Sequence, residues 1–129
     1  MTDHVVAIHK LALLADGPGA EPTVTQFDHF GARVDELYTS EGWRGLKAVT
    51  AVEGLVSESF ERRWGPYSRI SAFAKTFLWV PESRYVSCPN SMSDGLARVM
   101  ELAGTEEMKK EIIPRIISYV LVLSLSSKD

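Results

Sequence analysis

Apolar residues occur along the chain in blocks, and turn-forming residues separate these blocks. The first block, residues 5–14, is apolar at both alternating sets of positions. A strand with two apolar faces is typical of a sheet that helices cover on both sides. We therefore predict a strand over residues 5–14, although a buried helix fits the same run. The last block, residues 116–125, has an unbroken alternating apolar face and predicts another strand.

Helical spacing dominates two blocks between these ends. In residues 23–40, Thr23 and Gln26 have the spacing of a capping box, and apolar residues then recur every three or four positions. This pattern predicts a helix over residues 23–40 that is terminated by Gly42. A second helix is predicted over residues 67–78, with Pro81 just beyond its end.

The segment 46–64 fits two structures. Residues 46–52 suit a strand, because Val49, Thr50 and Val52 favour a pleated surface, but they also fit a short helix. A helix is then expected up to Trp64. The choice between strand and helix for residues 46–52 stays open.

Turn and cap residues set the remaining boundaries. They predict a strand over residues 84–88, a helix that begins at Ser91 or Ser93 and ends at Gly104, and a helix that begins at Thr105 and ends or kinks at Pro114. Strands separated by helices favour a parallel or mixed sheet with right-handed crossovers. We therefore predict an α/β fold, a small parallel or mixed sheet flanked by helices, with a mainly α fold as the alternative.

The overall composition indicates one soluble domain over residues 1–129. The chain has 129 residues, 45% of them hydrophobic, and a net charge of −3, which argues against binding nucleic acid mainly through its phosphates. A single cysteine, Cys88, cannot form an internal disulfide and favours a reducing compartment. The N-terminus lacks the basic start of a secretory signal, and the apolar runs are too short to cross a bilayer as helices. We expect a cytoplasmic protein that does not bind membranes.

Motifs for catalysis are not apparent. Gly17-Pro18-Gly19 lacks the third glycine of a dinucleotide loop, because Pro22 stands in its place. The three histidines have no zinc-site spacing, and Cys88 has no base assigned to it, so it is expected to be a small buried thiol. We predict no catalytic residue, no metal site, no cofactor and no enzymatic activity, with a small enzyme of unrecognised site as an alternative.

Residues 60–85 form the most unusual segment. They contain seven of the twelve aromatic residues, together with five basic residues and two acidic ones. Interleaved basic and aromatic side chains can hold RNA, and the same residue types are enriched at protein interfaces. The alternative is that Phe73, Phe77 and Trp79 are simply core residues. The candidate partner- or RNA-binding residues are Arg62, Arg63, Trp64, Tyr67, Arg69 and Lys75.

The chain as a whole resembles the small assembly and genome-packaging protein of the cystoviruses, the enveloped double-stranded RNA bacteriophages. The resemblance rests on the opening run His4–Lys10 and the closing run Ile116–Leu123. It implies a dimeric α/β core similar to the BRCT protein-interaction fold. It also implies a role in the viral polymerase complex, in the host cytoplasm and the virion core, where the family stabilises the capsid nucleus and assists RNA packaging.

The resulting hypothesis is a non-enzymatic protein–protein interaction module that acts in the assembly of a larger complex. Its expected partners are a second copy of itself, in a homodimer, and capsid and polymerase proteins. The alternative function is an RNA-contacting packaging cofactor that uses the segment 60–85.

Overall fold

The computed structural model of the chain describes residues 5–117, which fold mainly into helices. The elements in chain order are α1 (Val5–Ala15), β1 (Thr23–Phe27), β2 (Arg33–Tyr38), α2 (Glu41–Val52), α3 (Ser57–Glu61), η2 (Gly65–Tyr67), α4 (Ser68–Trp79), η3 (Val80–Glu82), α5 (Ser87–Ala103) and α6 (Glu106–Ile117). In this part of the chain the sheet consists of two antiparallel strands. The structure is thus helix-rich and agrees with the mainly α alternative, whereas the predicted parallel or mixed sheet and the BRCT-like arrangement are wrong.

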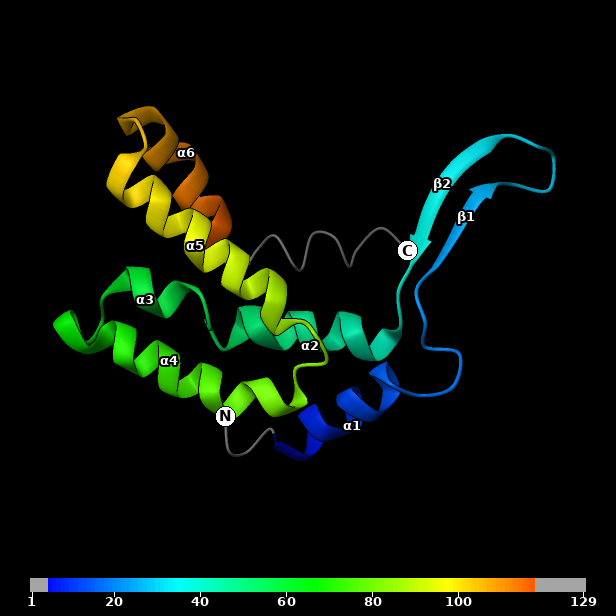
Figure 1. Cartoon of the computed structure of the whole chain (residues 1–129), viewed down its shortest axis with the longest axis horizontal. Coiled ribbons are helices and arrows are strands. Elements are labelled where there is room, and N and C mark those ends of the chain that lie inside the picture. The colour runs from blue at the N-terminus through cyan, green and yellow to red at the C-terminus, as the bar shows by residue number, and fades with distance from the viewer. Residues whose placement is uncertain (1–4, 118–129) are drawn as a thin grey trace.

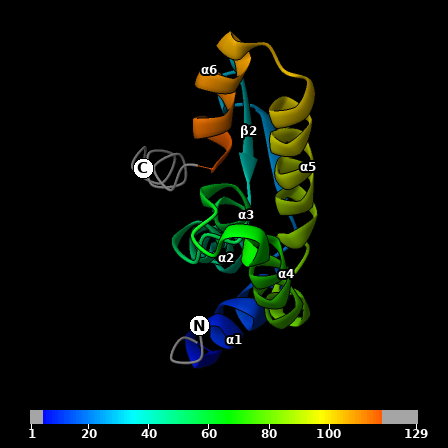
Figure 2. The same cartoon turned by 90° about the vertical axis from the view of Figure 1, so that its left-hand side faces the viewer.

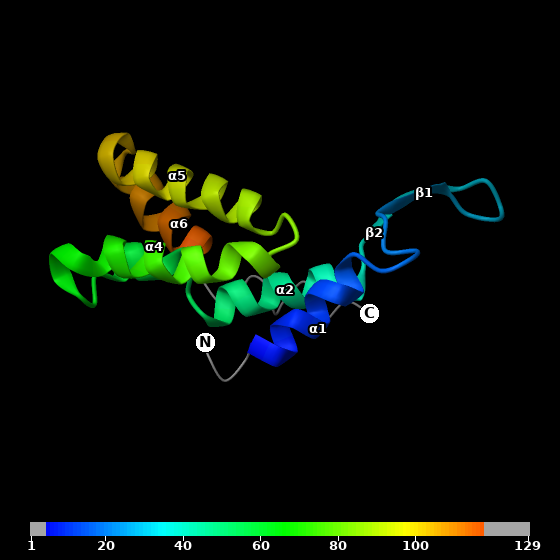
Figure 3. The same ribbon diagram turned by 60° about the horizontal axis from the view of Figure 1, so that its bottom comes forward.

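The helices pack as pairs, and the β-hairpin projects from them. Helix α1 packs on α2, α3 on α4, and α5 on α6. Figure 1 shows the hairpin β1–β2 extending away from the helices, beyond the start of α2. Figure 2 shows α5 and α6 side by side on one side of α2, α3 and α4, with α1 on the other side. In Figure 3, α2 and α4 accordingly lie between α1 and the pair α5–α6.

Helix α1 replaces the strand predicted over residues 5–14. Its buried residues are Ile8 and Ala12, which are one helical turn apart and therefore lie on the same face. A run that is apolar at nearly every position satisfies strand and helix periodicity alike. Packing against α2 decides between them, and the strand prediction is wrong.

Glycines in α2 allow its close approach to α1. A Cβ atom on Gly42 would lie 2.3 Å from the carbonyl oxygen of Leu11 and 2.4 Å from the backbone nitrogen of Ala15. Only a residue without a side chain fits at this position in the first turn of α2. The prediction that Gly42 terminates a helix is wrong. Ser40 caps the helix, since its Oγ accepts a hydrogen bond of 3.2 Å from the backbone N–H of Trp43.

The helix predicted over residues 23–40 is in fact the β1–β2 hairpin. The Asp28 carboxylate accepts hydrogen bonds from the backbone N–H groups of Phe30 (2.8 Å) and Ala32 (2.9 Å), and Gly31 adopts a φ of +82°. This turn chemistry reverses the chain, and the helical spacing of apolar residues does not prevail over it. Every residue of both strands is exposed. An isolated two-stranded hairpin is marginally stable in water, so this arm is expected to need a covering surface.

The segment 46–52 is helical, as part of α2, and the helix predicted over residues 67–78 is confirmed by α4. The strand predicted over residues 84–88 is wrong, because Arg84 and Tyr85 have left-handed φ angles of 45° and 66°. A helix cannot start at Ser91 or Ser93 either, because α5 already begins at Ser87.

The C-terminal boundaries are largely as predicted. Gly104 ends α5, and Thr105 caps α6 by accepting a 3.2 Å hydrogen bond from the backbone N–H of Met108. Helix α6 continues past Pro114 to Ile117, so Pro114 does not end it. The first two residues of the strand predicted over 116–125 belong to α6, and the other eight lie outside the described residues.

A small apolar core holds the helices together. Its cluster comprises Ile8, Leu46, Leu55, Trp79 and Val86, which come from α1, α2, α4 and the connections around them.

Of the helices in residues 5–117, none combines the length and the apolar character that a bilayer crossing requires.

The α1–α2 crossing supplies a test. We expect Gly42→Ala to lower the free energy of unfolding by about 2 kcal/mol or more, because its Cβ meets backbone atoms that cannot move without separating the helices. Gly95→Ala in α5 is the matched control, since no atom lies within 4 Å of its added Cβ. The control should raise stability by about 0.5–1 kcal/mol. Urea denaturation measures both, and equal effects of the two substitutions would contradict the packing described.

Candidate functional site

Helix α4 turns its large apolar side chains outward. Its buried residues are Ser68, Ala72 and Trp79, of which two are small. Phe73 and Phe77, by contrast, are 61% and 78% exposed. We call the exposed stripe the α4 outer face; it consists of Tyr67, Ile70, Phe73, Phe77 and Leu78. A surface helix normally buries its apolar stripe, and an exposed stripe of this kind is typical of an interaction surface.

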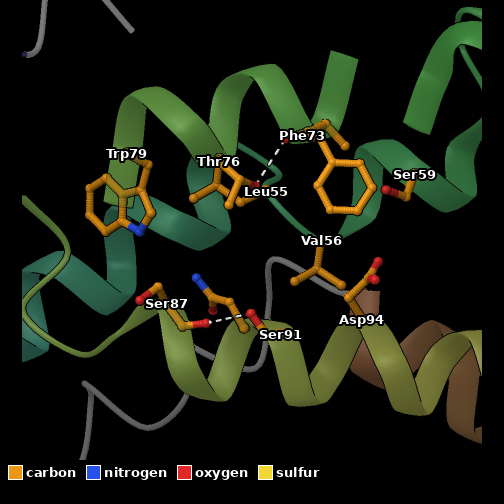
Figure 4. A pocket seen from close by; sticks show the side chains of 11 residues that line it. Leu55, Val56, Ser59, Phe73, Thr76, Trp79, Ser87, Ser91 and Asp94 are labelled. Atoms are coloured by element: carbon orange, nitrogen blue, oxygen red, sulfur yellow. Dashed lines mark hydrogen bonds between the residues drawn. The ribbon is translucent and has the colours of Figure 1, made fainter. Parts of the chain in front are cut away.

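A cleft of about 140 Å³ lies between α4 and α5, beside the α4 outer face. Figure 4 shows Phe73, Thr76 and Trp79 reaching into it from α4, and Ser87, Ser91 and Asp94 facing them from α5. Leu55, Val56 and Ser59 close it from the segment around α3 (Figure 4). We call this space the α4–α5 cleft.

Two N–H donors in this cleft have no acceptor among the described residues. They are the Trp79 indole Nε1 and the Asn90 amide Nδ2, and both atoms are buried. Trp79 is only 1% exposed, and its indole nitrogen is turned toward α5 (Figure 4). A buried donor without an acceptor costs about 1–3 kcal/mol and calls for an explanation.

Three other polar side chains of the cleft have hydrogen-bond partners. The Thr76 hydroxyl donates to the Ala72 carbonyl at 2.9 Å, and the Ser91 hydroxyl donates to the Ser87 carbonyl at 3.0 Å. The Asp94 carboxylate accepts two hydrogen bonds from Arg69, at 2.7 and 3.2 Å. The Trp79 and Asn90 N–H groups therefore differ from these neighbours in having no hydrogen-bond partner.

A buried carboxylate joins α3 to α4 on the other side of α4. Glu58 is 6% exposed and accepts hydrogen bonds from Lys75 and Ser71. Burial by itself raises the pKa of Glu58, but the hydrogen bonds from Lys75 and Ser71 and the charges of Lys75 and Arg63 outweigh it, so the pKa lies below its ordinary value. The charged form of Glu58 therefore stabilises this contact at neutral pH.

The structure places the predicted site residues around α3, η2 and α4. All four cations are paired with carboxylates: Arg62 with Glu101, Arg63 with Glu61, Arg69 with Asp94, and Lys75 with Glu58. These pairs leave little uncompensated positive charge for phosphate. The aromatic candidates Trp64 and Tyr67 are 62% and 68% exposed.

Two important residues were missed by the sequence analysis. Trp79 was considered only as a core residue, and Asn90 was not considered. Trp79 is indeed buried, whereas Phe73 and Phe77 are exposed and not core. The available signal was the tryptophan at the end of the predicted helix. Sequence spacing does not show, however, that the indole N–H of Trp79 lacks an acceptor.

The cysteine, the histidine and the glycine loop considered in the sequence analysis do not come together in one site. Cys88 is exposed, so its expected burial is wrong. His9 lies 3.3 Å from Glu82, and Gly17-Pro18-Gly19 connects α1 to β1 rather than a strand to a helix. Across residues 5–117, no group of three or more His, Cys, Asp or Glu side chains is placed to hold a metal ion.

Comparison with known protein families identifies the family of this chain. Residues 6–120 match the family described as the adaptive response protein AidB N-terminal domain. The chain belongs to this family. The resemblance to the cystovirus packaging protein is therefore wrong, and with it the roles in capsid assembly, the polymerase complex and RNA packaging.

Relatives of this AidB N-terminal domain are much longer proteins. Acyl-CoA dehydrogenase family member 11 of Caenorhabditis elegans is 34% identical over 102 residues, which are 76% of this chain and 16% of the relative. The apo-form of Bd2924 superposes with a TM-score of 0.81 at 36% identity, over 89% of this chain and 22% of that one. The crystal structure of C. elegans ACDH-11 in complex with C11-CoA superposes with a TM-score of 0.78 at 31% identity, over 91% of this chain and 20% of that one.

The chain thus spans at most 22% of the length of the proteins that it matches. The C. elegans relative is named an acyl-CoA dehydrogenase family member, so the hypothesis of a viral assembly module is contradicted, and the prediction of no enzymatic activity does not extend to that relative.

Glu58 generates a pH-dependent prediction. Because its folded pKa is lowered, its contribution to stability is complete above its ordinary pKa of 4.5 and is lost as the pH falls through the folded pKa. We expect Glu58→Gln to cost about 1–3 kcal/mol at pH 7. The difference from wild type should shrink below a pH of about 4.5.

Urea denaturation at a series of pH values measures this difference. Glu107→Gln serves as the control, since Glu107 lies exposed in the first turn of α6. Parallel stability curves for wild type and Glu58→Gln across the acidic range would refute the assignment.

Proposed function

We propose that this chain is the N-terminal domain of a longer acyl-CoA dehydrogenase-type protein and that its α4 outer face packs on the dehydrogenase body. The inverted burial of α4 carries the proposal, because Phe73 and Phe77 are 61% and 78% exposed while the small residues Ser68 and Ala72 are buried. The share of the relatives that lies outside the matched region, at least 78% of each chain, supplies a body large enough to cover such a face. A stable interface typically buries about 800 Å² on each partner.

We assign acyl-CoA binding to the body rather than to this domain alone. Four cavities between the described elements measure about 140, 200, 240 and 280 Å³. Sites for cofactor-sized ligands usually measure about 300–1,000 Å³. The domain therefore serves the enzyme by packing on and positioning the body, and the catalytic groups come from elsewhere in the longer protein.

The predicted contact residues fit this proposal as part of the interface. Trp64 and Tyr67 extend the α4 outer face beyond the start of the helix, and both are exposed. Arg62 and Arg63 are paired with carboxylates, so we propose them as a polar rim that excludes water rather than as phosphate ligands. Lys75 pairs with Glu58 on the other side of α4 and has a structural role in this proposal. The homodimer prediction shares a protein partner with this proposal, and the test below separates a second copy from the body.

The interface is tested by Phe73→Asp combined with Phe77→Asp in the full-length dehydrogenase. Two buried charges would oppose packing, so the domain should detach, and limited proteolysis should release it at least about tenfold faster, which corresponds to about 1.4 kcal/mol. Lys110→Asp is the control, because it changes the net charge by the same two units at an exposed position of α6. It should leave the release rate unchanged.

Light scattering after size exclusion distinguishes the partners. Detachment of the domain without loss of subunits supports packing on the body of the same chain. Dissociation into single chains would instead assign the face to a second copy. Unchanged proteolysis and unchanged mass in the double variant would refute the proposed interface.

A further inference from the structure

We propose that the α4–α5 cleft receives an uncharged carbonyl or amide oxygen from the dehydrogenase body, held by the N–H groups of Trp79 and Asn90. This inference rests on the proposed packing of the body on the α4 outer face. It adds the chemical group that the domain recognises there.

The two free groups in the cleft are both donors. The Trp79 indole nitrogen can only donate, and the free atom of Asn90 is its amide nitrogen. The Thr76 and Ser91 hydroxyls and the Asp94 carboxylate already have partners within the domain. None of them accepts a hydrogen bond from Trp79 or Asn90, so an oxygen atom from outside the domain is the group that would satisfy these donors.

The charge of the cleft argues for a neutral acceptor. The Asp94 carboxylate lines the same space and would repel an anion such as a phosphate or a carboxylate. Its partner Arg69 already donates to both of its oxygens, at 3.2 and 2.7 Å, so the pair adds little positive charge to the cleft. A backbone carbonyl or an Asn or Gln side-chain oxygen fits these conditions.

The size of the cleft argues for a single group rather than a whole ligand. Its volume of about 140 Å³ is close to that of an engineered apolar cavity that holds benzene. Apolar walls are supplied by Leu55, Val56 and Phe73, which suits one side chain or one short bend of backbone. A cavity this small is below the usual range for cofactors.

The position of the cleft links it to the proposed interface. Phe73 belongs both to the cleft lining and to the α4 outer face. An element of the body that lies on this face therefore passes the cleft opening. The free-energy cost of the two unpaired donors in the separate domain is removed when the body docks. Docking therefore depends on the Trp79 and Asn90 N–H groups.

The experiment removes each donor without changing its shape in the full-length dehydrogenase. Asn90→Leu keeps the size of the side chain, and 3-benzothienylalanine in place of Trp79 exchanges only the N–H for sulfur. Each change removes one of the two donors to the body oxygen, so we expect limited proteolysis to release the domain about tenfold faster, or about 1.4 kcal/mol. The controls are Ser91→Ala in the same cleft and 3-benzothienylalanine at Trp43, and both should match wild type.

Two outcomes overturn the inference, and they are distinguishable. If the wild-type domain is protected but both donor variants are released at the wild-type rate, packing on the body stands and the donor role fails. If the wild-type domain is itself unprotected, the proposed function fails and this inference with it. A crystal structure of the full-length protein is the second measurement. An oxygen of the body within hydrogen-bond distance of Trp79 Nε1 supports the proposal, whereas water alone or an oxygen from this chain contradicts it.

Discussion

The packing of Trp79 is the interaction on which the other features depend. This side chain ends α4 and joins the core cluster with Ile8 of α1, Leu46 of α2 and Val86 before α5. The same indole that fills this core directs its N–H into the α4–α5 cleft. The core and the candidate site therefore share one residue.

The position of Trp79 also determines which face of α4 is left outside. Because Ser68, Ala72 and Trp79 face inward, the phenylalanines on the other side cannot reach the core. The exposed hairpin adds a second surface that the domain does not cover itself. A domain with a small core and two uncovered apolar surfaces is typical of a part of a larger protein, which agrees with the length of its relatives.

Sequence patterns predicted those elements in which local chemistry and packing agree. The helix α4, the Thr105 cap and the end of α5 at Gly104 follow from spacing and cap residues. Residues 5–14 were assigned wrongly because their apolar pattern fits both strand and helix, and packing on α2 decides between them. Residues 23–40 were assigned wrongly because the turn at Asp28 prevails over the helical spacing of their apolar residues. Sequence reasoning selected the segment 60–85, which contains Phe73, Phe77 and Trp79 but not Asn90. Which side of α4 faces the solvent depends on tertiary packing that spacing alone does not fix.

Coverage of the α4 outer face by a dehydrogenase body is the proposal that most needs a test. Hydroxyl-radical footprinting tests it most directly, because oxidation of phenylalanine follows its exposure to water. We predict that Phe73 and Phe77 react strongly in this chain alone, where they are 61% and 78% exposed, and become protected in the full-length dehydrogenase. Equal reactivity of the two phenylalanines in both proteins would contradict the account.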